Sequence, residues 1–85
     1  MHYVYVIVIK SLKSDFLYVG QTSNLKARFA RHNALKDIST KAYGPFKLVY
    51  YEAYGNKKDA LVREMKLKHY GSSLGHLKKR LINSL

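Results

Sequence analysis

Two polar side chains occur at helical spacing on a face that is otherwise apolar. Arg28 and His32 lie four residues apart and fall between Leu25 and Leu35 on a helical projection. A guanidinium that faces apolar groups loses hydration, so an anion from the protein or from a ligand must compensate its charge. The alternative is that Arg28 extends to the rim of the core and that His32 is a core histidine with its hydrogen bonds satisfied.

A carboxylate stands at a comparable position later in the chain. In the stretch from Lys57 to Tyr70, whose pattern predicts a helix, Glu64 projects between Ala60 and Leu61 on the apolar side. A carboxylate in such surroundings needs a counter-charge. Two candidates can supply it: Lys68, one helical turn later in the favourable order, or a divalent cation.

Three short apolar stretches predict the strands that must position these groups. Tyr3–Ile9 is an unbroken run of β-branched and aromatic residues, Phe16–Gly20 follows a polar loop, and Phe46–Tyr54 follows a Gly-Pro pair. Both faces of the first run are apolar, which predicts a central strand covered on two sides. Alternation places four side chains of the third stretch on one side: Phe46, Leu48, the core aromatic Tyr50, and Glu52.

Turn residues that commonly cap helices precede the helical stretches. Ser23 or Asn24 caps the stretch that carries Arg28, and Asn56 forms a capping pair with Asp59 at the start of the stretch that carries Glu64. The order of these elements predicts an α+β fold, with a small three-stranded antiparallel sheet flanked by about three helices. We expect residues 1–85 to form a single domain.

The last stretch predicts an amphipathic helix with a basic face. Gly71 ends the preceding helix, and Ser72 or Ser73 caps this one. Its apolar stripe consists of Leu74, Leu77, Leu81 and Leu85. Its outer face carries His76, Lys78, Lys79 and Arg80. Such a face is either simply solvated or holds a phosphate backbone.

The charge of the chain favours a polyanionic partner. Its 85 residues include 16 Lys and Arg against five Asp and Glu, for a formal net charge of +11, which favours nucleic acid over an acidic membrane. The alternative is that the basic surface only keeps the protein soluble. The absence of cysteine excludes disulfides and thiolate metal sites, and the first apolar run is too short to cross a bilayer. We therefore expect a cytoplasmic protein with no membrane anchor.

Two tripeptides, in order with the polar residues above, resemble the signature of the GIY-YIG nuclease superfamily. The tripeptides are Tyr3-Val4-Tyr5 and Tyr18-Val19-Gly20, followed by Arg28, His32 and Glu64. The resemblance implies a DNA endonuclease. It also implies that Tyr5 is the general base, that Tyr18 positions the water or a phosphate oxygen, and that Arg28 neutralises the transition state. His32 would hydrogen-bond the nucleophile or relay its proton, and Glu64 would bind one Mg²⁺ or Mn²⁺ ion.

The resemblance also indicates where nucleic acid is contacted. Gln21 stands where several family members carry a lysine, and Thr40 and Lys41 lie in a loop that touches the substrate backbone in the family. We expect these further contacts to nucleic acid: Lys68, Lys78, Lys79 and Arg80. The asparagine that some members carry in the last helix aligns near His76, and its place is taken by His76, by Asn83 or by no residue.

Two other functions fit the same residues. The first is a nucleic-acid-binding module on the same fold with little turnover. The second is an interaction domain whose basic surface meets a partner protein. A partner protein could also supply DNA specificity to a nuclease, since a single domain has no additional DNA-binding domain that recognises a base sequence. No small-molecule cofactor is expected.

Overall fold

Three strands and three helices make up the described part of the chain, which in this computed structural model comprises residues 1–9, 17–34, 46–69 and 71–84. The order is β1 (His2–Ile9), β2 (Leu17–Thr22), α1 (Leu25–Asn33), β3 (Phe46–Tyr54), α2 (Lys57–His69) and α3 (Gly71–Arg80). The strands form one antiparallel sheet in the order β2-β1-β3. The predicted α+β class and the central position of the first strand are confirmed.

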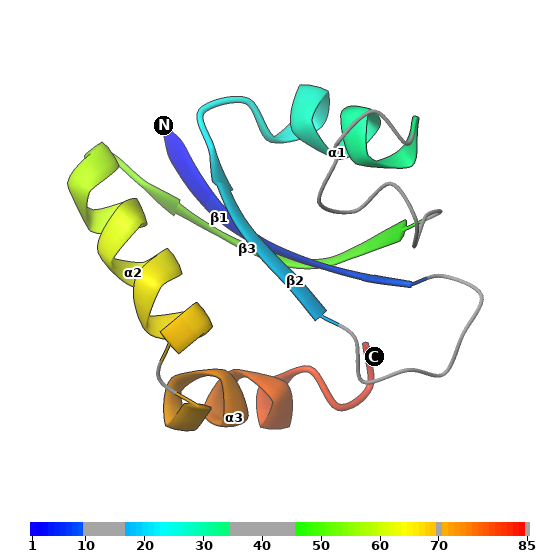
Figure 1. Ribbon diagram of the computed structural model, residues 1–85, viewed down its shortest axis with the longest axis vertical. Helices are drawn as coiled ribbons and strands as arrows, with labels where there is room; N and C mark the ends of the chain where they lie inside the picture. The colour runs from blue at the N-terminus through cyan, green and yellow to red at the C-terminus, as the bar shows by residue number, and fades with distance from the viewer. Residues whose placement is uncertain (10–16, 35–45, 70, 85) are drawn as a thin grey trace.

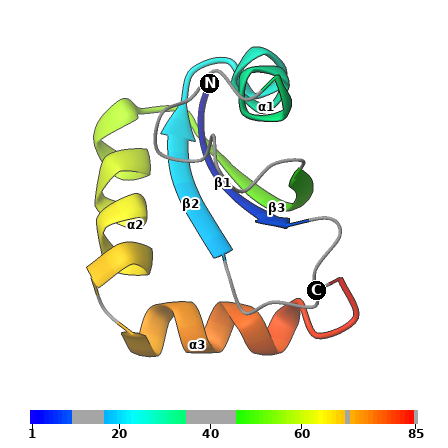
Figure 2. The same ribbon diagram turned by 45° about the vertical axis from the view of Figure 1, so that its right-hand side comes forward.

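The sheet separates two helical layers. α1 covers one face, whereas α2 and α3 cover the other (Figure 1), and the view turned by 45° shows the same division (Figure 2). Alternation along β1 sends Tyr5 and Ile7 into the α1 layer and Val4 and Val6 into the other layer. All four side chains are fully buried. Both faces of β1 are therefore core, as the unbroken apolar run predicts.

β3 changes face in its middle. Its register against β1 shifts between Val6 and Ile7, whose partners are Tyr50 and Leu48, so Val49 is the extra residue of a β-bulge. The prediction that four side chains of this strand share one side is therefore wrong, because alternation does not continue through a bulge. The α1 layer receives Phe46 and Leu48, and the layer of α2 and α3 receives Tyr50, Glu52 and Tyr54.

The predicted caps are found at the first two helices but not at the third. The side chain of Asn24 accepts a hydrogen bond from the backbone N–H three residues later, and that of Asn56 accepts one from the N–H two residues later. α3, by contrast, begins at Gly71, so Ser72 and Ser73 lie within it rather than before it. A glycine between two helical stretches indicates a break between them, but it does not show whether the glycine ends the first helix or begins the second.

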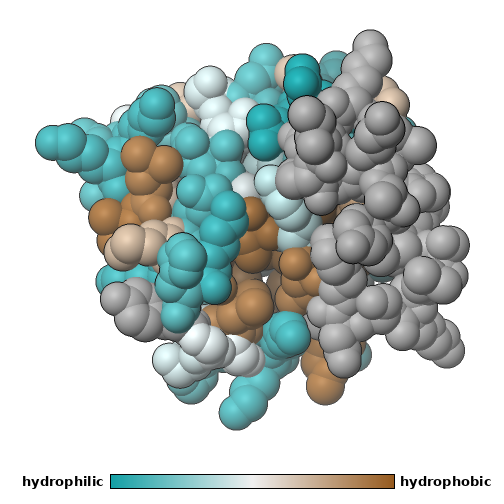
Figure 3. Space-filling model, viewed as in Figure 1, coloured by the Kyte–Doolittle hydropathy of each residue, from teal (hydrophilic) through white to brown (hydrophobic). Residues whose placement is uncertain are grey.

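The buried side of α2 is narrower than its sequence predicts. Ala60 and Leu67 are buried, but the Leu61 side chain is 43% exposed. Together with Val62 and Met65 it forms an apolar strip on the outside of the helix, and hydrophobic surface is visible over α2 in Figure 3. Apolar residues occur on several sides of this helix, so periodicity alone does not identify the side that meets the sheet.

A carboxylate on β3 attaches α2 to the sheet. Tyr50 donates a hydrogen bond from Oη to Glu52 Oε2 at 2.5 Å, and Tyr54 donates one to Oε1. Arg63 of α2 donates from Nε at 3.0 and 3.2 Å and from Nη2 at 3.0 Å. Burial alone would raise the pKa of Glu52, but the hydrogen bonds from these three residues and the charge of Arg63 outweigh it and lower that pKa. Burial and the bond to Glu52 raise the pKa of Tyr54 to about 12.

We expect Glu52→Gln to lower the free energy of unfolding by about 1–3 kcal/mol, because it leaves a partly buried guanidinium without its carboxylate. The pKa of Glu52 is lower in the folded protein than its usual 4.5. The stabilising contribution of the Glu52 carboxylate is therefore complete above its usual pKa of 4.5, and it is lost as the pH falls through the lower pKa of the folded protein. Urea unfolding from neutral to acidic pH should show this loss in the wild type and not in the variant.

The matched control is Glu64→Gln, which removes a carboxylate from a more exposed ion pair on α2 and should cost less than about 0.5 kcal/mol. Equal destabilisation by the two substitutions would contradict the role given to Glu52.

Candidate active site

Three polar side chains meet in the α1 layer. The Oη atom of Tyr5 lies 2.7 Å from Nε2 of His32 and accepts a hydrogen bond from Nε of Arg28 at 3.1 Å. Tyr5 and His32 are fully buried, and Arg28 is half-buried. The face of α1 that carries Arg28 and His32 therefore meets the sheet, as its spacing predicts, and there it meets the phenol of the first tripeptide.

Tyr18 joins this group from β2. Its ring centroid lies 5.1 Å from that of His32, in an edge-to-face arrangement, and 6.4 Å from that of Tyr5. Phe46 also contacts the imidazole edge-to-face, with a centroid distance of 6.0 Å. Aromatic rings thus surround the imidazole and fix its position. Tyr18 is half-buried, so it forms part of the accessible side of the cluster.

Gly20, which pairs with Tyr5 across the two strands, provides the space for the Tyr5 hydroxyl. A Cβ atom at this position would lie 2.3 Å from Oη and 2.4 Å from Cζ of Tyr5. Both distances are far inside van der Waals contact, and the buried Tyr5 ring has little room to move. The glycine of the second tripeptide is therefore required by the tyrosine of the first.

Gly20→Ala should destabilise the fold by about 1–3 kcal/mol, because the added methyl group overpacks the core and displaces the Tyr5 ring. Thermal or urea unfolding would measure the loss. Gly75→Ala is the control, since nothing lies within 4 Å of its added Cβ and alanine is a better helix residue than glycine. A Gly20→Ala protein as stable as the wild type would show that the Tyr5 ring is not confined.

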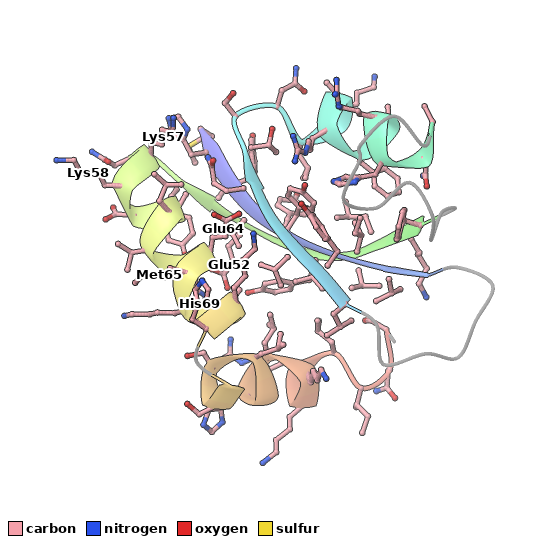
Figure 4. The ribbon with its side chains drawn as sticks, in the orientation of Figure 1. Glu52, Lys57, Lys58, Glu64, Met65 and His69 are labelled. Atoms are coloured by element: carbon pink, nitrogen blue, oxygen red, sulfur yellow. The ribbon has the colours of Figure 1, made fainter. Side chains whose placement is uncertain are left out.

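Lys68 connects Glu64 with the tyrosines. Its Nζ atom lies 3.3 Å from Oε2 of Glu64 and 5.8 Å from the centroid of the Tyr18 ring. Figure 4 shows Glu64 between α2 and the sheet. A continuous series of contacts thus runs from Glu64 through Lys68 and Tyr18 to His32 and Tyr5. Lys68, one of the two counter-charges considered for Glu64, therefore pairs with it.

The donor set at Glu64 fits a hard divalent cation that keeps most of its water. Within the residues that the structure describes, no three His, Cys, Asp or Glu side chains gather as a metal site. A single carboxylate suits Mg²⁺, which is commonly held by one or two carboxylates, waters and substrate phosphates. The ion pair with Lys68 is partly exposed and weak, so a cation can replace the ammonium group.

A surface cavity opens beside Arg28. Its volume is about 540 Å³, within the range of sites that hold small ligands. Two arginines line it, three residues apart on α1. The lining residues are Thr22, Asn24, Ala27, Arg28, Ala30, Arg31 and Ala34. The cavity is therefore positively charged, and Arg28 connects it with the Tyr5 cluster. Thr22 and Asn24, which cap the start of α1, line its polar edge.

The residues predicted to contact nucleic acid are not all at this cluster. Gln21 pairs with Val4, and alternation places it on the face of α2 and α3, opposite to Tyr18. Lys41 lies outside the described residues, as does Thr40. Lys68 is beside Tyr18, whereas three residues lie on α3: the half-buried Lys78 and the exposed Lys79 and Arg80.

Two further residues support the site without having been predicted to do so. Asn33 Oδ1 accepts a hydrogen bond from the backbone N–H of Phe46 at 2.7 Å and so joins the end of α1 to the start of β3. Arg31 lines the cavity beside Arg28. An asparagine directly after His32 was a visible signal for the first, since this residue type commonly bonds backbone groups near helix ends.

The comparison with protein families gives the class of this chain. Residues 1–78 match the model of the GIY-YIG catalytic domain, so the chain belongs to the GIY-YIG family. Its relatives include UPF0213 proteins, which are small members of that family.

Three of these relatives come from Staphylococcus haemolyticus, Clostridium perfringens and Haloquadratum walsbyi. They are 41%, 41% and 33% identical to this chain over 70, 69 and 70 residues. The alignments cover 81%, 80% and 81% of this chain and 82%, 71% and 75% of the relatives. No solved structure matches the chain.

Family membership determines the broad class of activity. The GIY-YIG domain indicates a nuclease, a hydrolase that acts on nucleic acid, and nucleases of this family generally depend on divalent metal ions. In the described residues, no helix is both long and apolar enough to cross a bilayer.

Proposed function

We propose that the protein is a divalent-metal-dependent DNA endonuclease, structure-selective or weakly sequence-specific, of the repair or recombination type. The observation that carries this proposal is the Tyr5 hydroxyl, held between His32 at 2.7 Å and Arg28 at 3.1 Å. A phenol between a proton acceptor and a fixed positive charge is suited to accept a proton from an attacking water. The net charge of +11 favours a nucleic-acid substrate.

Arg28 has two tasks in this proposal. A guanidinium only donates hydrogen bonds, so the oxygen of Tyr5 is the acceptor in their contact. The positive charge stabilises the phenolate form of Tyr5, and the same charge at the cavity beside α1 neutralises the phosphoryl group as negative charge develops on it. Tyr18, on the accessible side, orients the water or a phosphate oxygen.

His32 takes the proton that Tyr5 releases. With Nε2 as the acceptor, the hydroxyl hydrogen of Tyr5 points along the 2.7 Å contact, and the ring carries its own hydrogen on Nδ1. The proton then moves from the water to Tyr5 and from Tyr5 to His32. Both side chains are fully buried, so the step from Tyr5 to His32 is shielded from bulk solvent.

Glu64 would hold the Mg²⁺ or Mn²⁺ ion, which when bound supplies a Lewis acid for the leaving oxygen. The protein has to release the Glu64 carboxylate from Lys68 for this purpose. Lys68 would then stay beside Tyr18, where its charge can meet a substrate phosphate. One protein carboxylate implies that substrate and water complete the coordination, so binding of the ion and of DNA should be coupled.

The test is incubation of the purified protein with branched, flapped and linear duplex DNA, and with matched RNA, in Mg²⁺, in Mn²⁺ and in a chelator. We expect product from DNA only with a metal ion, and loss of product but not of binding in Arg28→Ala. If about five phosphates are contacted, log K should fall with a slope of about −4.5 against log salt. Salt-sensitive binding without product under any condition would favour the binding module instead.

A further inference from the structure

A polar pocket lies on the other side of the sheet, away from the Tyr5 cluster. It has a volume of about 230 Å³ and is lined by Arg63 of α2 and by four residues of α3: Ser73, His76, Leu77 and Arg80. Three of these side chains can donate hydrogen bonds with positive or neutral N–H groups, and Ser73 adds a hydroxyl. Arg63 belongs to the Glu52 network, whereas the α3 residues have no part in the proposed catalysis.

The guanidinium of Arg63 is held in a fixed orientation toward this pocket. Its Nε and Nη2 atoms donate to Glu52, and Glu52 in turn accepts hydrogen bonds from Tyr50 and Tyr54. Among the described residues, Nη1 of Arg63 has no hydrogen-bond partner. A guanidinium fixed on one edge loses little entropy when its remaining N–H groups bind an anion.

The charges around the pocket leave a positive excess. Arg63 and Arg80 contribute two positive charges, and the carboxylate of Glu52 compensates one of them. The side chains of His76 and Arg80 are both exposed, so an anion in solution can reach them. Fork-shaped guanidinium groups match the oxygens of a phosphate better than they match a spherical anion.

We propose that this pocket binds a phosphate group of nucleic acid, at a position distinct from the scissile phosphate. The proposal rests on nucleic acid being the partner of this protein. Arg63 and Glu64 are consecutive on α2, so their side chains leave the helix about 100° apart. Arg63 bonds to Glu52 on β3, whereas Glu64 reaches Tyr18 on β2 through Lys68. A phosphate in the pocket therefore lies on a different flank of α2 from the candidate metal ligand.

Two kinds of phosphate share the chemistry that this pocket recognises. One is an internal phosphodiester, from a part of the substrate that passes along α2 and α3. The other is a terminal phosphate monoester at a strand end. The internal group carries one negative charge and the terminal group nearly two, so the terminal group should bind more tightly if it can reach the pocket.

The first experiment is an NMR titration of the intact protein with inorganic phosphate. We expect saturable shifts at the His76 ring and at the backbone amides of residues 73–80, and Arg80→Gln should weaken this binding about fivefold. Lys58→Gln is the charge-matched control, because Lys58 extends into solvent at the far end of α2 (Figure 4) and should leave the affinity unchanged. Shifts confined to other residues, or equal effects of the two substitutions, would overturn the proposal.

The second experiment separates the two sources of phosphate. Tighter binding of a 5′-phosphorylated oligonucleotide than of its 5′-hydroxyl form, abolished in Arg80→Gln, assigns the pocket to strand ends. A salt slope for duplex binding that is smaller by about one in Arg80→Gln, with no preference for the phosphorylated end, assigns it to the backbone. If neither difference appears, the pocket does not bind nucleic acid. None of these readouts depends on cleavage, so a protein without nuclease activity could still pass them.

Discussion

Tyr5→Phe should reduce the rate of DNA cleavage by about 10²–10⁴-fold while leaving DNA affinity nearly unchanged. The substitution removes one oxygen, which is the atom that contacts both His32 and Arg28. General acid–base groups contribute rate factors of this size, and a buried hydroxyl contributes little to binding of the substrate backbone. Single-turnover cleavage and a separate binding measurement would test the two parts of this expectation.

Tyr51→Phe is the matched control for that experiment. Tyr51 pairs with Tyr5 in the sheet, but it is 54% exposed and lies outside the cluster, so cleavage should change less than about twofold. Unfolding of Tyr5→Phe must be measured as well, because the buried Nε2 of His32 loses a partner, at a cost of about 1–3 kcal/mol. A folded Tyr5→Phe protein that cleaves at the wild-type rate would exclude the Tyr5 hydroxyl from the chemistry.

Glu64→Gln should lower metal-dependent cleavage by about 10³-fold or more. A Lewis-acid ion contributes several kcal/mol to the transition state, and each 1.36 kcal/mol corresponds to a factor of ten in rate. The amide keeps the size of the side chain but removes the negative charge that would hold the ion. The enhancement of water proton relaxation by Mn²⁺ gives a direct readout, and we expect the protein–DNA complex of the variant to lose it.

Two variants on the same helix serve as controls for Glu64. Asp59→Asn removes an exposed carboxylate from the first turn of α2 and should retain cleavage. Lys68→Gln removes the ammonium group that pairs with Glu64, so the concentration of Mg²⁺ needed for half-maximal cleavage should fall. Unchanged activity in Glu64→Gln, or an unchanged metal requirement in Lys68→Gln, would contradict the view that the lysine and the ion compete for this carboxylate.

Local signals predicted much of the architecture correctly. The apolar run of β1, the extent of β3 and the caps at Asn24 and Asn56 are short-range features, so composition and turn chemistry were sufficient to find them. The four-residue spacing of Arg28 and His32 also predicted their shared face correctly. That this face meets Tyr5 could be expected from the family resemblance, but not from spacing, because strand pairing joins residues far apart in the chain.

Other features depended on tertiary packing and were predicted wrongly or missed. The bulge at Val49 adds one residue to β3 without a turn residue to mark it. Leu61 is exposed because the sheet packs against another side of α2. The Glu52–Arg63 pair joins two residues that are eleven positions apart on successive elements, and neither residue alone indicated a partner. The need for a small residue at Gly20 became visible only from the position of the Tyr5 ring.

Because of the bulge at Val49, side chains of β3 pack into both layers of the core. Leu48 packs with Tyr5 and Phe46 in the α1 layer, whereas Tyr50, two positions later, donates a hydrogen bond to Glu52, the carboxylate that holds Arg63. Substitutions at Leu48 and at Tyr50 should therefore have nearly independent effects, since the two side chains pack in different layers. If both proposals hold, sequence change near Leu48 would affect the surroundings of Tyr5, whereas change near Tyr50 would affect those of Arg63.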